Sequence, residues 1–197
     1  PYTTPVQAKL NLILGMNLDI EYIMPAHGII WKDYIADIIE TYKDIAAQKT
    51  ENKAVIVYES VWKHTQQIAE SLAEGFSDGG MDVKVYKLSD TKSSIVMREI
   101  MDAKIVCIGS GTYNNVMAPS VAAFLEHIRP CKFKHKKGLA FAAYGWFNQV
   151  AKEIDTRMQQ SGIESCHDVI NQCYTPSDDQ LEDYFNVAKE IAKNCQE

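Results

Sequence analysis

The sequence lacks the features that mark membrane and secreted proteins. None of its apolar runs approaches the roughly 20 residues that a helix needs to span a bilayer. The first residues also lack the charged-then-apolar pattern of a secretion signal. These absences predict a protein of the cytoplasm that contacts no membrane.

Cysteine pairs are missing as well. The 197 residues include five cysteines, an odd number, and no CxxC pair occurs. This pattern fits neither a disulfide framework nor a zinc site. We therefore expect five reduced thiols with mainly structural roles.

Cationic residues are in the minority. The 20 Lys and Arg residues are outnumbered by 26 Asp and Glu residues, which gives a net charge of −6. An acidic chain disfavours nucleic acid as a partner, because phosphate binding needs clustered cations. We expect the one basic cluster, at 132–137, to be a solvated loop between a helix and a strand.

Beyond residue 53 the sequence alternates between β-branched apolar runs and helical patterns. The polar segment 48–53 precedes the apolar run 54–58, and this change indicates a domain boundary. Strands separated by helical crossovers predict an α/β fold with a doubly wound, five-stranded parallel sheet and helices on both faces. The expected strands and helices alternate as 53–58, 65–76, 82–88, 93–102, 104–109, 118–127, 138–144, 148–161, 167–173 and a last helix opening at Thr175 and Pro176.

Residues 1–50 have a different pattern. We expect a helix at 5–15, a strand at 20–24, a turn at 25–28 and a helix at 33–47. This is too little chain for an independent domain with its own core. The segment therefore resembles the end of a larger domain.

A doubly wound sheet binds its ligand outside the carboxyl ends of its strands, which directs attention to three loops. The loop after the first strand, 59–65, leads into a helix and offers the hydroxyls of Ser60 and Thr65. Successive backbone amides at a helix N-terminus bind phosphate. GxGxxG and Walker patterns are missing, which argues against a dinucleotide or a nucleoside triphosphate and favours one terminal phosphate.

The other two loops combine small and aromatic residues. In the loop after the third strand, 109–115, small residues allow a planar ring to approach the backbone, and Tyr113 can stack on it. The loop after the fourth strand, 143–148, holds three aromatic residues. Taken alone, the first loop also fits an ordinary helix cap, the second an ordinary Gly/Asn loop and the third local packing of aromatic side chains. Together they predict a site for an aromatic monophosphate.

The loops resemble those of flavodoxins, and most closely those of the flavodoxin domain of flavodiiron proteins. The family motifs are Ser/Thr-x-Trp-x-x-Thr, Gly-Ser-Pro-Thr-Tyr-Asn-Asn and Tyr-Gly-Trp. They are matched here by Ser60, Trp62, Thr65, Gly109, Ser110, Thr112, Tyr113, Asn114, Asn115, Tyr144, Gly145 and Trp146. Departures from the family pattern are Lys63, His64, Gly111, Ala143, Phe147 and Asn148.

The resemblance implies a flavodoxin-like fold over 53–197 that binds FMN and passes electrons. The phosphate is expected at the first loop and the flavin ring at the other two. The cofactor-binding residues implied are Ser60, Val61, Trp62, Lys63, His64, Thr65, Ser110, Gly111, Thr112, Tyr113, Asn114, Asn115, Ala143, Tyr144, Gly145, Trp146, Phe147 and Asn148.

Residues 24–31, Met-Pro-Ala-His-Gly-Ile-Ile-Trp, resemble the closing segment of the family's metallo-β-lactamase-like domain. The resemblance makes residues 1–50 a remnant of that domain and His27 the last ligand of a diiron centre. The other ligands, in a motif resembling His-x-Glu-x-Asp-His, do not occur here, so the centre is expected only in the intact protein. We expect a fragment that is not itself a complete oxygen or nitric oxide reductase.

In the intact protein, the resemblance implies that FMN relays electrons to the diiron centre, where oxygen or nitric oxide is reduced. It also implies a head-to-tail homodimer, and a rubredoxin or a reduced deazaflavin as electron donor.

Three other functions are compatible with parts of the pattern. A receiver domain would need an acidic cluster after the first strand, where Glu59 stands alone, and a Lys after the fifth, where Cys173, Tyr174 and Thr175 follow. A flavodoxin-like quinone or azo reductase would oxidise NADH or NADPH directly. A flavin-free interaction module would require His64 and Phe147 to block the pocket.

Overall fold

A computed structural model describes residues 2–195. The chain divides between Lys49 and Thr50 into two compact units. No helix of residues 2–195 is both long enough and apolar enough to cross a membrane. All five cysteines are free thiols, as the sequence predicts.

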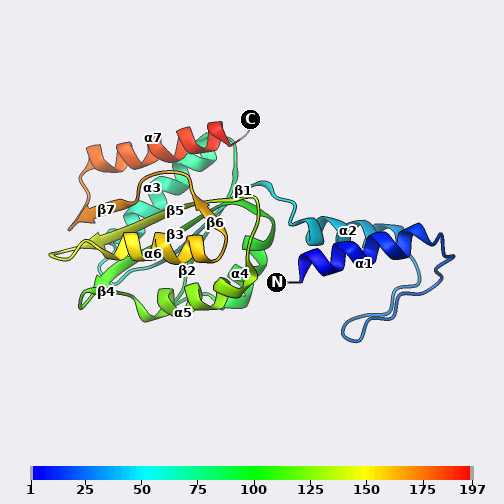
Figure 1. The fold of residues 1–197 in the computed structure, drawn as a ribbon. Coiled ribbons are helices and arrows are strands. Elements are labelled where there is room, and N and C mark those ends of the chain that lie inside the picture. Colours follow the sequence, from blue (N-terminus) through cyan, green and yellow to red (C-terminus); the bar gives the residue numbers. More distant parts are fainter. Residues whose placement is uncertain (1, 196–197) are drawn as a thin grey trace. The chain divides into compact units, whose positions relative to one another are not determined.

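The larger unit is a mainly parallel sheet with helices on both faces (Figure 1). The strands lie in the order β2-β1-β3-β5-β6, β7 also pairs with β5, and only β4 runs antiparallel, against the end of β3. The strands are β1 (Glu51–Glu59), β2 (Asp82–Lys87), β3 (Ala103–Tyr113), β4 (Val116–Met117), β5 (Lys136–Tyr144), β6 (Ile163–Ser165) and β7 (Ile170–Cys173). The predicted doubly wound sheet is confirmed, with seven strands in the described residues where five were expected.

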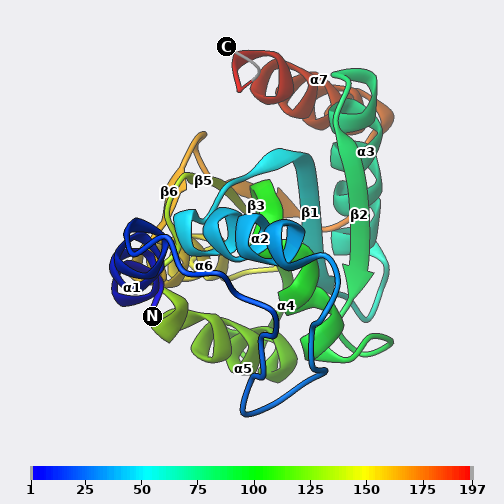
Figure 2. The same cartoon turned by 90° about the vertical axis from the view of Figure 1, so that its right-hand side faces the viewer.

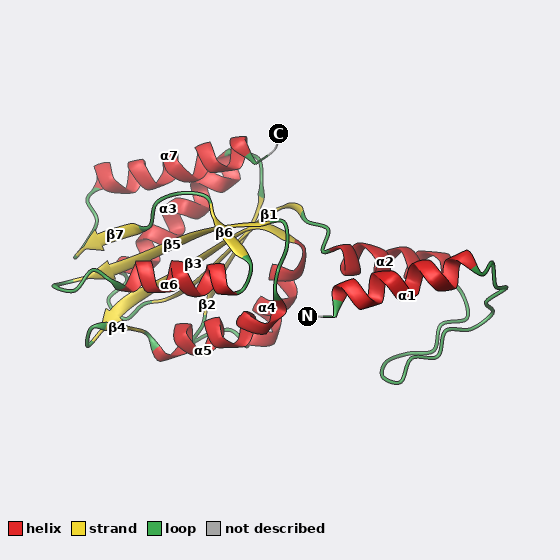
Figure 3. Cartoon of the chain, in the orientation of Figure 1, coloured by secondary structure: helices red, strands yellow, loops and turns green. Residues whose placement is uncertain are grey.

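The helices cover the two faces unequally, with α3 and α7 on one side and α4, α5 and α6 on the other (Figure 3). Along β1, Ala54 and Ile56 pack toward α3 and α7, while Val55 and Val57 pack toward the other three helices. This two-sided burial is why the strand is a continuous apolar run. The helices are α3 (His64–Asp78), α4 (Ser93–Asp102), α5 (Pro119–Ile128), the 3₁₀ turn η1 (Arg129–Cys131), α6 (Val150–Gln160) and α7 (Asp178–Asn194).

Helices α3 and α7 lie side by side over their face of the sheet (Figures 1 and 2). Gly75 makes this close approach possible, because a Cβ atom there would lie only 2.2 Å from the carbonyl oxygen of Phe185. The hydroxyl of Ser71 also donates a hydrogen bond to the carbonyl of Leu181. The pairing of these helices holds the N-terminus of α3 in place at the functional edge.

The last strand and the last helix differ from the sequence prediction. The strand expected at 167–173 is found only as β7, at 170–173, because the exposed polar residues His167 and Asp168 lie outside the ladder. The short strand β6 precedes the expected range and was not predicted. Helix α7 begins at Asp178 rather than at Thr175, since Ser177 and Gln180 form a reciprocal capping box.

The basic cluster at 132–137 is only partly the solvated loop that was expected. Lys136 opens β5 and is 1% exposed. Its ammonium donates hydrogen bonds to the carbonyls of Met101, at 3.0 Å, and Ala103, at 2.8 Å, which end α4. Lys137 pairs with Glu164 at the surface. Lys136 is therefore a structural cap, and burial lowers its pKa to about 8.

The smaller unit contains two helices, α1 (Thr3–Gly15) and α2 (Ile35–Ala47), joined by an extended loop (Figure 1). The prediction of a strand at 20–24 was wrong, because this segment forms only an isolated antiparallel bridge between Ile23 and Trp31. Helix α1 has no buried residue and α2 has one, Ala46. The exposed large apolar side chains of this unit are Tyr2, Leu12, Ile13, Met16, Leu18, Tyr22, Met24, Ile29, Ile30, Tyr34, Tyr42 and Ile45.

Candidate functional site

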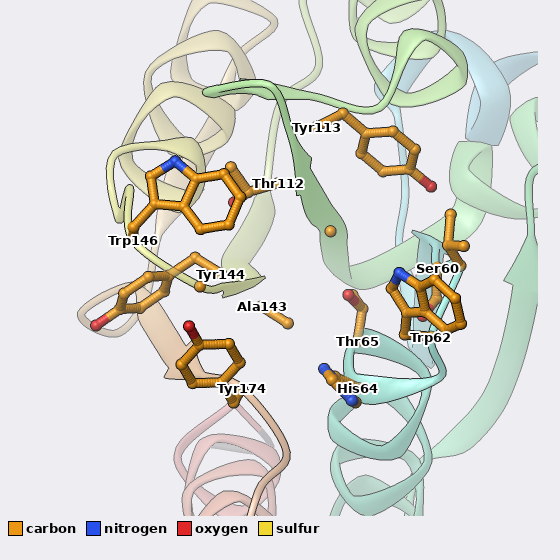
Figure 4. A pocket seen from close by; sticks show the side chains of 13 residues that line it. Ser60, Trp62, His64, Thr65, Thr112, Tyr113, Ala143, Tyr144, Trp146 and Tyr174 are labelled. Atoms are coloured by element: carbon orange, nitrogen blue, oxygen red, sulfur yellow. The ribbon is translucent and has the colours of Figure 1, made fainter.

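A cavity of about 470 Å³ lies at the carboxyl ends of the parallel strands (Figure 4). It brings together residues from all three predicted loops and one residue from a fourth segment. Its lining consists of Ser60, Val61, Trp62, His64, Thr65, Gly111, Thr112, Tyr113, Ala143, Tyr144, Gly145, Trp146 and Tyr174. Twelve of these thirteen were expected from the sequence, and six expected residues do not line the cavity: Lys63, Ser110, Asn114, Asn115, Phe147 and Asn148.

The N-terminus of α3 opens onto this cavity. The helix has no side-chain cap, and its first intrahelical bond runs from the amide of Gln67 to the carbonyl of Lys63. The amides at 64–66 are the helix's orphan donors. Thr65 and Ser60 beside them are 1% and 7% exposed. Amides, hydroxyls and the helix dipole together favour an anion here.

The second predicted loop is instead a β-hairpin. β3 continues to Tyr113 and pairs with β4, and Asn114 and Asn115 make the turn in the left-handed region, at φ 46° and 67°. Consecutive positive φ angles fit the tight turns in which Asn is favoured. These two residues do not line the cavity, whereas Thr112 and Tyr113 do.

Two hydroxyls of this hairpin have opposite roles. Ser110 is fully buried and used internally: its Oγ accepts from the amide of Ala118 at 2.8 Å and donates to the carbonyl of Gly111 at 2.7 Å. Thr112 Oγ1 is buried without a hydrogen-bond partner among the described residues, although it lies in the cavity lining. A buried hydroxyl without a partner is costly, and with its oxygen covered, Thr112 faces the cavity through the rest of the residue.

The third loop supplies aromatic side chains. Trp146 and Trp62 are 82% and 81% exposed, and Figure 4 shows them on opposite sides of the cavity. Large exposed rings facing a cavity are suited to a planar ligand. Phe147 packs against the core on the α6 side, and the side chain of Asn148 bonds Gln149, so neither enters the cavity.

Sequence reasoning missed Tyr174, which lies beside Tyr144 in the cavity (Figure 4). Its backbone is in the left-handed region, at φ 56°, and its amide donates to the carbonyl of Tyr144 at 2.8 Å. A Cβ atom at Gly145 would lie 3.4 Å from its ring. Its position directly after the fifth predicted strand could have indicated this role, because the carboxyl end of that strand lies at the same edge of the sheet as the three loops.

The predicted metal ligand His27 lies exposed in a bend of the smaller unit, directly before Gly28 at φ 111°. Within residues 2–195, no group of three or more His, Cys, Asp or Glu side chains could hold a metal ion.

The sequence model of a family described as Flavodoxin matches residues 56–187. The chain belongs to the flavodoxin family. Among its relatives, a nitric oxide reductase of Moorella thermoacetica is 39% identical over 164 residues, which are 83% of this chain and 41% of the relative. An anaerobic nitric oxide reductase flavorubredoxin of Pectobacterium carotovorum is 32% identical over 98% of this chain and 39% of the relative.

Solved structures of flavodiiron type resemble the whole chain. The rubredoxin oxygen:oxidoreductase of Desulfovibrio gigas superposes with a TM-score of 0.95 at 31% identity, over 100% of this chain and 49% of that one. The flavodiiron protein of Giardia intestinalis superposes with a TM-score of 0.88 at 26% identity, over 96% of this chain and 48% of that one. The chain thus spans about half the length of these proteins.

These matches confirm the predicted family, fold and cofactor: the chain carries the flavodoxin-like FMN domain of flavodiiron proteins. The diiron centre of such proteins belongs to their other domain. The cavity fits FMN in its chemistry, with uncapped amide donors for an anion at the start of α3 and exposed aromatic rings at the mouth.

Proposed function

We propose that the cavity holds FMN with its phosphate at the N-terminus of α3 and its ring among the aromatic side chains of the second and third loops. The observation that carries this proposal is the uncapped start of α3, which opens onto a cavity lined by aromatic side chains. Ser60, Thr65 and the amides at 64–66 would hold the phosphate. Trp62, Tyr113, Tyr144, Trp146 and Tyr174 would orient the ring.

FMN supplies the redox chemistry, since it can accept and donate electrons, whereas the protein supplies binding, orientation and electrostatics. The amide donors of α3 balance the phosphate charge. The wide mouth leaves the site open to a redox partner, because both tryptophans at its rim are more than 80% exposed. We infer an electron-transfer domain rather than a hydrolase or a group transferase.

For the whole protein we propose that electrons leave this domain for a diiron centre that reduces oxygen or nitric oxide. The names of the relatives, nitric oxide reductase and rubredoxin oxygen:oxidoreductase, support this reaction class and a rubredoxin as donor. A reduced deazaflavin is the other donor we consider. We place the protein in the cytoplasm, as a homodimer.

Residues 1–49 would then belong to the metallo-β-lactamase-like domain of the whole protein, with His27 as a diiron ligand there. The exposed apolar side chains of this unit support the assignment, because a two-helix unit with so little buried surface needs further chain to cover it.

The proposal is tested by adding FMN to the purified chain, desalting it and recording the visible spectrum, with iron measured on the same sample. Retained flavin without iron is the expected result. Loss of the flavin on desalting would contradict the proposed site. Sustained NADH or NADPH oxidation with a quinone would instead indicate a quinone reductase.

A further inference from the structure

Glu59 is a buried carboxylate at the edge of the cavity. It is the last residue of β1, is 8% exposed, and pairs in register with Ser110 of β3. The next residue, Ser60, lines the cavity. Glu59 therefore directly precedes, in the chain, the loop that we assign to the phosphate.

The carboxylate lies within hydrogen-bonding distance of donors on three separate segments. Oε1 accepts from the amide of Ser60 at 2.9 Å, and Oε2 accepts from the hydroxyl of Ser120 at 3.3 Å. The Ser89 hydroxyl lies 3.4 Å from Oε1, but its single proton also has a closer acceptor, Asp90 Oδ1 at 2.9 Å. Ser89 lies between β2 and α4, and Ser120 lies in the first turn of α5. One side chain thus joins the β1–α3 loop to the start of α5 and lies beside the β2–α4 loop.

None of the ion pairs within residues 2–195 includes Glu59. Burying a carboxylate without a cation is costly, and the Ser60 and Ser120 donors and the nearby N-terminus of α5 offset only part of that cost. Its influence extends to the cavity lining: burial raises the pKa of Tyr113, and the Glu59 carboxylate raises it further.

We propose that Glu59 is a positioning residue of the flavin site, which fastens the phosphate-binding loop and whose negative charge makes the bound flavin harder to reduce. The inference rests on the proposed FMN site. A fixed charge beside the cavity opposes the addition of electrons to the ring, and the surrounding low dielectric strengthens that opposition. The fastening of the loop depends on the hydrogen bonds of Glu59, whereas the effect on the flavin potential depends on its charge. Different substitutions can therefore separate the two roles.

Four variants of the chain test the two parts. Glu59→Gln keeps the size of the side chain and a carbonyl acceptor but removes the charge. Glu59→Ala removes both the acceptor and the charge. Ser120→Ala removes one donor and leaves the charge in place. Glu74→Gln, at an exposed position on α3 outside the cavity lining, is the matched control for a change of one charge.

The readouts are the dissociation constant of oxidised FMN, from quenching of flavin fluorescence, and the midpoint potential of the bound flavin. For Glu59→Gln we expect affinity for oxidised FMN within about threefold of the wild type. We expect its preference for reduced over oxidised flavin to rise about tenfold, an upward shift of about 30 mV for a two-electron couple. Glu59→Ala should bind oxidised FMN about tenfold and Ser120→Ala about threefold more weakly.

An unchanged potential in Glu59→Gln, or an equal shift in Glu74→Gln, would overturn the redox role. Wild-type affinity in Ser120→Ala and in a folded Glu59→Ala would overturn the fastening role. The wild-type chain is measured first, because failure to bind FMN there defeats the proposed function, whereas identical behaviour of wild type and variants defeats only the role of Glu59.

Discussion

The imidazole Nε2 of His64 lies 3.1 Å from the hydroxyl of Thr175 and joins the start of α3 to the segment between β7 and α7. Both segments border the cavity, one at the proposed phosphate and the other next to Tyr174. This bond gives His64, which departs from the family pattern, a structural partner.

We expect Thr175→Val to weaken FMN binding about two- to tenfold, because one hydrogen bond contributes about 0.5–1.5 kcal/mol. Fluorescence quenching of FMN measures the change. Thr156→Val is the matched control, since the Thr156 hydroxyl bonds only the carbonyl of Lys152 on the exposed side of α6. Equal affinities for wild type and Thr175→Val would show that the bond does not support the site.

Trp146→Ala should also weaken FMN binding about two- to tenfold, the range expected for one lost aromatic contact. The stability of the flavin-free protein should change by less than about 0.5 kcal/mol, because the ring is 82% exposed. Flavin titration and urea denaturation measure the two effects. Trp146→Phe, which keeps a ring, should retain most of the affinity, and an equal loss in both variants would argue against stacking.

The buried Lys136 predicts a pH dependence of stability. Its pKa is lowered to about 8 from an ordinary 10.5, so between these values the unfolded chain binds more protons than the folded one. Stability therefore rises with pH across that window. Relative to Lys136→Met, the wild type should gain up to about 3 kcal/mol between pH 8 and 10.5. Urea denaturation at several pH values gives both curves, and parallel curves would refute the assignment.

Gly75→Ala should destabilise the larger unit by more than about 2 kcal/mol, because the added Cβ atom would collide with the carbonyl of Phe185 and separate α3 from α7. Gly15→Ala, at the end of α1 with nothing within 4 Å of the added atom, is the control and should be neutral or slightly stabilising. Thermal denaturation followed by circular dichroism compares the two. A Gly75→Ala protein as stable as the wild type would refute the close packing.

The parts of the fold that the sequence predicted depend on local patterns. Continuous apolar runs such as 54–58 identify strands buried on both faces, and small, hydroxyl and aromatic residues at the strand ends identify the cavity. The differences depend on tertiary contacts. Whether Phe147 turns into the core or into the cavity is decided by α6 packing beside it. Lys136 is buried because the carbonyls at the end of α4 lie within its reach.

Tyr174 shows that tertiary contacts also decide which residues reach the site. Its sequence neighbours give no phosphate or flavin motif, and it reaches the cavity because β7 pairs with the carboxyl end of β5. Asn114 and Asn115 show the converse, since a family motif predicts them at the site while they form the hairpin turn and do not line the cavity.

The uncapped start of α3 has a consequence for the stability of the protein in the cell. An anion bound there interacts with the folded state alone, because the unfolded chain has no aligned helix amides, and such a ligand adds stability in proportion to the logarithm of its concentration. The abundance of this domain would then follow the supply of flavin. When FMN is scarce, the empty protein unfolds more often and becomes accessible to proteases.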